Sequence, residues 1–188
     1  NSMSKKCYLF MLAAVFTGVG LEAQPSAEKK KVLVVYFSHS GNTKEVANQI
    51  KEATGADVFE IVPEKAYPTN YQAVVDQAKK EIAEGHKPAI KGKIENIEQY
   101  DTIFVGSPCW WATIAPPVST FLSGYDLSGK TIIPFMTHEG SRMGHTGDDI
   151  KKLCPKSKVL DGFPVRGSQV KKAKEDILKW LREIKIIR

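Results

Sequence analysis

Short apolar runs alternate along the chain with amphipathic segments. The runs have the length of strands, and three are apolar at successive positions, as in parallel sheets covered by helices on both faces. These runs span residues 31–38, 56–62, 101–107, 130–137 and 157–163. The segments after them have the spacing of helices and span residues 43–55, 71–85, 116–124, 147–154 and 168–184.

Five successive strand–helix units predict an α/β fold with a doubly wound parallel sheet of five strands. Right-handed crossovers place helices on both faces, so the domain is a three-layer sandwich, expected over residues 31–188. The last helix carries one apolar stripe that should cover the sheet, made of Val170, Ala173, Ile177, Leu181 and Ile184. Ligands of such sheets bind beyond the carboxyl ends of the strands, where functional residues are therefore expected.

The amino-terminal residues do not follow this alternation. Two lysines precede an apolar run at residues 8–19, which is shorter than the roughly 20 residues of a membrane-spanning helix. We interpret residues 1–23 as a cloning remnant of two residues followed by a signal peptide, and residues 24–30 as a linker. An uncleaved anchor or a buried helix is the alternative. The signal peptide predicts an exported, periplasmic protein with no stable membrane span after cleavage.

The composition describes an ordinary globular chain that is basic, with 188 residues and a formal net charge of +6. Most lysines alternate with acidic residues at helical spacing, which is typical of solvated helix faces. No arginine-rich stripe or nucleic-acid motif is present, which argues against nucleic-acid binding. The histidines have no metal-ligand spacing, so no metal is expected.

The first predicted strand ends in a loop rich in small hydroxyl residues. Ser38, Ser40, Asn42 and Thr43 surround Gly41 just before a predicted helix. Backbone N–H groups, hydroxyl groups and the positive end of a helix dipole together make a phosphate site. The loop has neither a Walker motif nor a GxGxxG fingerprint. An ordinary N-cap by Ser40 or Asn42 is the alternative.

Two further strand ends should meet this loop at the same edge of the sheet. The third strand continues into "SPCWWATIAPPV", in which the adjacent Trp110 and Trp111 cannot both enter one core from a regular element. The fourth ends in "MTHEGSRMG". A phosphate loop beside a flat aromatic surface suits a phosphorylated planar ligand.

The motifs "SHSGNT", "SPCWWATIAPPV" and "THEGS", in this order at three strand ends, resemble the flavodoxin-like FMN-binding family. The resemblance is to a bacterial exported branch with a Pro-x-Trp-Trp loop and covers about residues 31–185. It implies FMN as cofactor, the strand order 2-1-3-4-5, and the short type without a long insertion in the fifth strand.

The resemblance also implies which residues bind FMN. The phosphate would be held by Ser38, Ser40, Gly41, Asn42 and Thr43, and the ring would be lined by Pro108, Cys109, Trp110 and Trp111. The loop over the pyrimidine edge would consist of Thr137, His138, Glu139 and Gly140. We expect Trp111 to pack against the third predicted helix instead of touching flavin. Tyr67 either closes over the flavin or forms a hydrophobic staple at a helix entry.

The resemblance predicts a redox protein that moves electrons between a donor such as NAD(P)H and either a small quinone-like acceptor or a redox partner protein. In enzymatic form it would be an FMN-dependent NAD(P)H:acceptor oxidoreductase, with His138 as the catalytic candidate. The basic charge, and His138 where carriers usually place an aromatic residue, depart from an acidic electron carrier. The alternatives are a flavin-binding module without turnover and a hydrolase built on Cys109 or His138. Cys109 and Cys154 are expected to stay unpaired.

Overall fold

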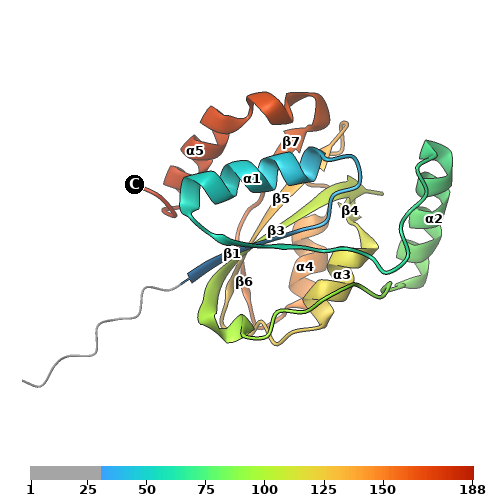
Figure 1. Ribbon diagram of the computed structural model, residues 1–188, viewed down its shortest axis with the longest axis horizontal. Coiled ribbons are helices and arrows are strands. Elements are labelled where there is room, and N and C mark those ends of the chain that lie inside the picture. Colours follow the sequence, from blue (N-terminus) through green and yellow to red (C-terminus); the bar gives the residue numbers. More distant parts are fainter. Residues whose placement is uncertain (1–30) are drawn as a thin grey trace, which may run out of the picture.

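The computed structural model describes residues 31–188, and their elements follow the predicted alternation (Figure 1). The strands are β1 (Lys31–Tyr36), β2 (Asp57–Glu60), β3 (Tyr100–Trp110), β4 (Thr113–Ile114), β5 (Thr131–His138), β6 (Lys158–Val159) and β7 (Phe163–Arg166). The helices are α1 (Asn42–Thr54), α2 (Tyr71–Glu84), α3 (Pro116–Ser123), α4 (Thr146–Leu153) and α5 (Lys174–Glu183), with 3₁₀ turns η1 (Ile97–Gln99) and η2 (Gly167–Lys172). The predicted signal peptide and linker, residues 1–30, lie outside the described residues.

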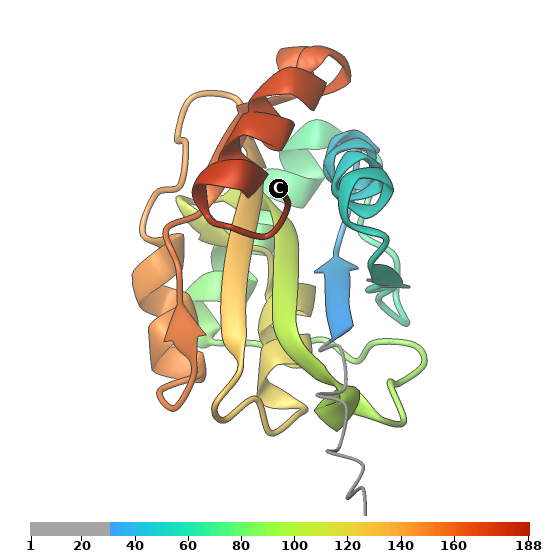
Figure 2. The same ribbon diagram turned by 90° about the vertical axis from the view of Figure 1, so that its left-hand side faces the viewer.

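The sheet has the order β2-β1-β3-β5-β6, and β7 also pairs with β5. These pairs are parallel, whereas the short β4 folds back antiparallel to β3. Figure 2 shows β1, β3 and β5 side by side at the centre. With β6 and β7 counted as one interrupted strand, the predicted 2-1-3-4-5 order and the α/β fold are confirmed.

The fifth strand is interrupted, which corrects the prediction of one continuous strand over residues 157–163. Its two parts, β6 and β7, are separated by residues 160–162. A Cβ on Gly162 would lie 2.7 Å from the carbonyl oxygen of Pro134, so Pro134 turns its backbone toward this gap. Proline has no N–H to donate, and the pairing therefore stops at that level and resumes beyond it. The interruption is short, so the chain has no long insertion here.

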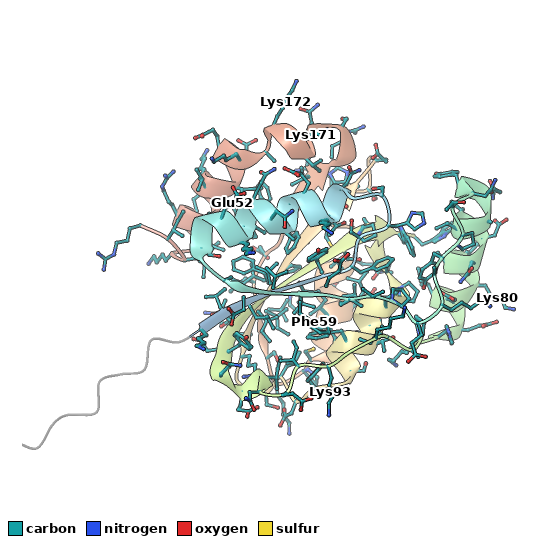
Figure 3. The ribbon with its side chains drawn as sticks, in the orientation of Figure 1. Glu52, Phe59, Lys80, Lys93, Lys171 and Lys172 are labelled. Carbon is teal, nitrogen blue, oxygen red and sulfur yellow. The ribbon has the colours of Figure 1, made fainter. Side chains whose placement is uncertain are left out.

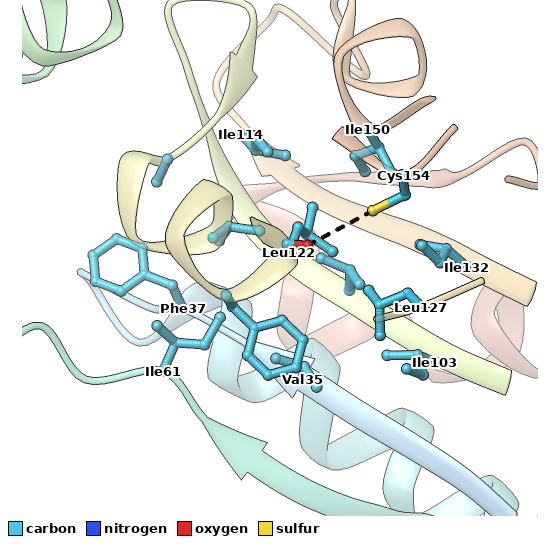
Figure 4. Close-up of a cluster of buried hydrophobic side chains, with 14 of the residues drawn as sticks. Val35, Phe37, Ile61, Ile103, Ile114, Leu122, Leu127, Ile132, Ile150 and Cys154 are labelled. Carbon is cyan, nitrogen blue, oxygen red and sulfur yellow. Dashed lines mark hydrogen bonds between the residues drawn. The ribbon is translucent and has the colours of Figure 1, made fainter. Parts of the chain in front are cut away.

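Two separate cores lie on the two faces of the sheet. Along β1, Leu33 and Val35 belong to the core under α3 and α4, whereas Val34 and Tyr36 belong to the core under α1 and α5. Figure 1 shows these helix pairs on opposite sides of the sheet, and Figure 4 shows part of the first core. This alternation explains why the strands are apolar at successive positions.

The carboxyl-terminal helix forms in two parts, which corrects the prediction of one helix over residues 168–184. The chain first makes the 3₁₀ turn η2 and then continues as α5. The apolar stripe is nevertheless buried as predicted, except Ile184, which is partly buried; its buried members are Val170, Ala173, Ile177 and Leu181. Within residues 31–188, no helix is both long enough and apolar enough to cross a membrane.

Helix α2 does not cover the middle of the sheet as the other helices do. Figure 1 shows it beyond the carboxyl ends of the strands. Only Val74 and Ala78 are buried among its residues. Helix α2 therefore faces the edge at which the predicted site residues gather.

Candidate functional site

The three predicted strand-end loops converge on one cavity of about 660 Å³. Most predicted site residues line it: Ser40, Asn42, Pro108, Cys109, Trp110, Trp111, Thr137, His138, Glu139 and Gly140. The other three do not line the cavity: Ser38 and Gly41 lie in the same first loop, and Thr43 lies in the first turn of α1. The structure thus brings the predicted residues together, while their binding of a cofactor stays a prediction.

The first loop is organised by Ser38. Its Oγ accepts hydrogen bonds from the backbone N–H groups of Gly41 and Lys44, each at 3.2 Å. Gly41 occupies the N-cap position of α1 with φ +96°, a conformation that glycine adopts without steric strain. The alternative of an N-cap by Ser40 or Asn42 is therefore wrong. Side chains of the loop already accept from two of the first N–H groups of α1, because Ser38 Oγ bonds that of Lys44 and Ser40 Oγ lies 3.4 Å from that of Asn42. The positive end of the helix dipole still favours an anion at this end of α1.

Thr43 joins the first loop to the end of β5. Its side chain is buried, and its Oγ1 lies 2.8 Å from Oγ1 of Thr137, which lines the cavity. Each hydroxyl can donate one hydrogen bond and accept another. This pair therefore fixes the distance between two of the three loops.

A tight hairpin carries the two tryptophans. In this Trp hairpin, residues 109–114, Trp110 pairs with Thr113 across the turn. The turn residues Trp111 and Ala112 both have positive φ, 51° and 63°. Left-handed backbone at residues with a Cβ is disfavoured by about 1–2 kcal/mol each, so the surrounding contacts must hold it.

Trp110 turns inward, toward the aromatic side chains beneath the cavity. Its ring centre lies 5.0 Å from that of Tyr67 and 5.4 Å from that of Phe37, both in edge-on arrangements. Tyr67 is buried, and its hydroxyl donates a 2.6 Å hydrogen bond to Glu81 Oε2 on α2. Burial, together with this carboxylate, raises the pKa of Tyr67. Tyr67 does not line the cavity; it supports Trp110 from below and ties it to α2.

Trp111 turns outward, which corrects the prediction that it packs against the third helix. It is 46% exposed, lines the cavity, and its Nε1 donates a 3.0 Å hydrogen bond to the carbonyl oxygen of Val75 on α2. The Lys79 ammonium lies 5.1 Å from its ring centre. The two indoles point apart because Trp110 is the last residue of β3, whereas Trp111 is the first residue of the turn.

Helix α4 clamps the Trp hairpin through residues that the sequence patterns did not single out. Asp149 Oδ2 accepts a 2.6 Å hydrogen bond from the Thr113 hydroxyl and lies 2.6 Å from His145 Nδ1. The His145 backbone N–H donates to the carbonyl oxygen of Ala112 at 2.8 Å. Burial would raise the pKa of Asp149, but the hydrogen bonds from Thr113 and His145 outweigh it and lower that pKa. The carboxylate therefore stays ionised to hold the hairpin.

His138 ends β5 with a buried ring nitrogen. Its Nδ1 has no hydrogen-bond partner within the described residues, although the side chain lines the cavity. Burial lowers the pKa of His138, Arg166 and Arg142 lower it further, and Glu139 partly offsets them. The ring is therefore neutral at neutral pH, and its Nδ1 is enclosed by the protein.

We expect an NMR titration to place the ring pKa of His138 below the ordinary value of about 6.5. Near that pH the unfolded chain therefore binds a proton at His138, whereas the folded chain keeps this ring neutral. The free energy of unfolding should therefore fall as the pH drops below about 6.5, and this part of the fall should disappear in His138→Gln. A ring that titrates at or above the value of a histidine in a short peptide would contradict the assignment.

Cys109 lines the cavity as a protonated thiol. Burial raises its pKa, only partly countered by a hydrogen bond with Ser141. Both Cys109 and Cys154 are free, and burial raises the pKa of Cys154 to about 11; Figure 4 shows this thiol directed at the carbonyl oxygen of Leu122. A nucleophilic cysteine needs the thiolate, so a hydrolase built on Cys109 gains no support. Residues 31–188 also contain no cluster of three or more His, Cys, Asp or Glu suited to a metal.

The opposite wall of the cavity comes from α2 and the loop before it, which sequence analysis did not assign to the site. Its residues are Thr69, Tyr71, Val74, Val75 and Ala78. The amphipathic pattern of this segment predicts a helix but not what its apolar face covers. Figure 1 shows the reason, because α2 lies beyond the strand ends and not over the sheet.

A family model described as flavodoxin matches residues 31–184. No curated protein sequence matches significantly.

Among solved structures, a protein from Bacteroides eggerthii described as a flavoprotein is 32% identical, with a TM-score of 0.67; the match covers 79% of this chain and 98% of that one. A second protein described as a flavoprotein, from Bacteroides uniformis, is 28% identical with a TM-score of 0.73; the match covers 81% of this chain and 97% of that one. A flavoprotein from Lactobacillus acidophilus, solved in complex with FMN, is 28% identical with a TM-score of 0.63; the match covers 76% of this chain and 97% of that one.

Proposed function

The chain belongs to the flavodoxin family, and we propose that it binds FMN in the cavity at the carboxyl edge of the sheet and uses it for electron transfer. The observation that carries this proposal is the joining, around one cavity, of a hydroxyl-rich loop at a helix N-terminus, an aromatic hairpin and the His138 side chain. The FMN complex of the Lactobacillus acidophilus flavoprotein supports the choice of cofactor.

The cavity residues fit the parts of FMN. The first loop, with Ser40 and Asn42 at the cavity and Gly41 at the N-cap, offers N–H and O–H groups to the phosphate. Trp110 offers an aromatic surface to the ring, and the His138 side chain lines the same cavity. When bound, FMN supplies reversible uptake of one or two electrons; the protein supplies position and charge.

We further propose a small quinone-like acceptor or a redox partner protein, with NAD(P)H as the class of donor. The basic composition and His138 at the end of β5 favour this over an acidic electron carrier. We also propose that the chain belongs to an exported branch of the family with a Pro-x-Trp-Trp loop. Export rests on the signal-like pattern of residues 1–23, and fractionation of cells that express the full chain would test it.

The test begins with the chain from residue 24 onward, titrated with FMN. We expect one FMN per chain, detected by the visible absorption of bound flavin, and reduction by NADH or NADPH followed by reoxidation with a quinone. Absence of FMN binding would overturn the proposal. Binding without any turnover would leave a flavin-binding module, the alternative function.

A further inference from the structure

The cavity has two chemically different walls. The three strand-end loops supply hydroxyl, amide and imidazole groups, whereas α2 and the tip of the Trp hairpin supply an apolar surface. This surface, here called the α2 wall, consists of Tyr71, Val74, Val75, Ala78, Trp111 and Ala112. The loops provide the phosphate and ring contacts proposed above, which leaves the α2 wall without a role.

Two large side chains of the α2 wall are held in solvent. Tyr71 is 81% exposed and Trp111 is 46% exposed, although both line the cavity. The position of Trp111 is fixed by its hydrogen bond to the Val75 carbonyl oxygen and by the positive φ values of the turn. A disfavoured backbone that keeps an indole out of the core indicates a use for that indole outside the fold.

The charges around the α2 wall indicate what it can bind. Among residues 31–188, no lysine or arginine lines the cavity, and Glu139 is its one carboxylate. Lys79 contacts the Trp111 ring but does not line the cavity. The α2 wall therefore offers no lysine or arginine to an anionic acceptor, whereas an uncharged flat ring can stack on the indole.

We propose that the α2 wall is the acceptor subsite and binds an uncharged planar acceptor of the quinone class beside the flavin. This rests on the proposed FMN function. Reduced FMN then gives up two electrons and two protons to the quinone, which leaves as the quinol while FMN returns to its oxidised form. A donor of the NAD(P)H class supplies the next two electrons.

The first experiment measures binding without turnover. The probe is 2-methyl-1,4-naphthoquinone, titrated calorimetrically into oxidised, FMN-loaded protein. Trp111→Ala and Tyr71→Ser should each weaken binding of the probe about five- to tenfold, and Trp111→Phe, which keeps a ring, should weaken it less. Matched controls are Val62→Ser, another exposed apolar side chain, and Lys80→Ala on the outer side of α2, both expected to be neutral (Figure 3).

The second experiment separates failure of the subsite from failure of FMN function. Dithionite-reduced protein is reoxidised either by the naphthoquinone or by ferricyanide, which needs no apolar subsite. The α2-wall variants should slow only the naphthoquinone reaction, with FMN affinity unchanged. Equal effects on both oxidants, or weaker FMN binding in Trp111→Ala, would overturn the subsite and assign the indole to the flavin. Absence of FMN binding in the wild type would instead overturn the proposed function.

Discussion

Replacing Gly144 by alanine should destabilise the protein by about 2–5 kcal/mol and greatly weaken FMN binding. A Cβ at this position would lie 2.1 Å from the carbonyl oxygen of Ala112, which is backbone and cannot rotate away. Gly144 also has φ +51°, which disfavours any residue with a Cβ. The Trp hairpin must therefore move, and it loses the hydrogen bond from the His145 N–H to Ala112.

The neighbouring Gly147 offers a matched control. A Cβ there has nothing within 4 Å, and Gly147 lies in the first turn of α4 without a positive φ. Gly147→Ala should therefore leave stability unchanged or raise it slightly. Thermal unfolding and FMN titration of both variants provide the measurement. If Gly144→Ala keeps the melting temperature and FMN affinity of the wild type, the clamp on the Trp hairpin does not hold the site.

The alternation of strands and helices could be predicted because both faces of the sheet are buried, so successive strand residues are apolar. Leu33 and Val34 enter different cores, and this appears in the sequence as an uninterrupted apolar run. The convergence of three loops follows from the parallel direction of the strands alone. Most of the site residues could therefore be predicted from the residue types at the strand ends and from the direction of the strands.

What could not be predicted depends on contacts between distant segments. The break in the fifth strand follows from Pro134 on the neighbouring strand, which no pattern within residues 157–163 reveals. Similarly, Asp149 holds the Trp hairpin across 36 positions of sequence. Such pairings appear only once the chain has folded.

The contacts of Trp111 could be predicted only in part from its place beside Trp110. The pair of tryptophans predicts that one of them leaves the core, and the structure confirms this. Its destination, the Val75 carbonyl on α2, depends on a helix whose apolar face looks ordinary in the sequence. Because α2 buries only Val74 and Ala78, other residues of this helix can line the cavity.

The phosphate of FMN should contribute so much binding free energy that riboflavin binds at least 100-fold more weakly. The first loop presents the Ser40 and Asn42 side chains to the cavity, and the helix dipole favours an anion there. A hydrogen bond to a charged group contributes about 1.5–3 kcal/mol, so two of them correspond to a factor of 100 or more.

Variants of the first loop can assign this preference to residues. Ser40→Ala should weaken FMN several-fold and leave riboflavin unchanged, because the hydroxyl lines the cavity and makes only a long, 3.4 Å hydrogen bond with the Asn42 N–H. Thr43→Ala should weaken both flavins, since its hydroxyl, paired with Thr137, sets the distance between two loops. Ser123→Ala, at the exposed end of α3, is the control. Calorimetric titration with both flavins measures these differences, and equal affinity for FMN and riboflavin in the wild type would show that the loop does not bind phosphate.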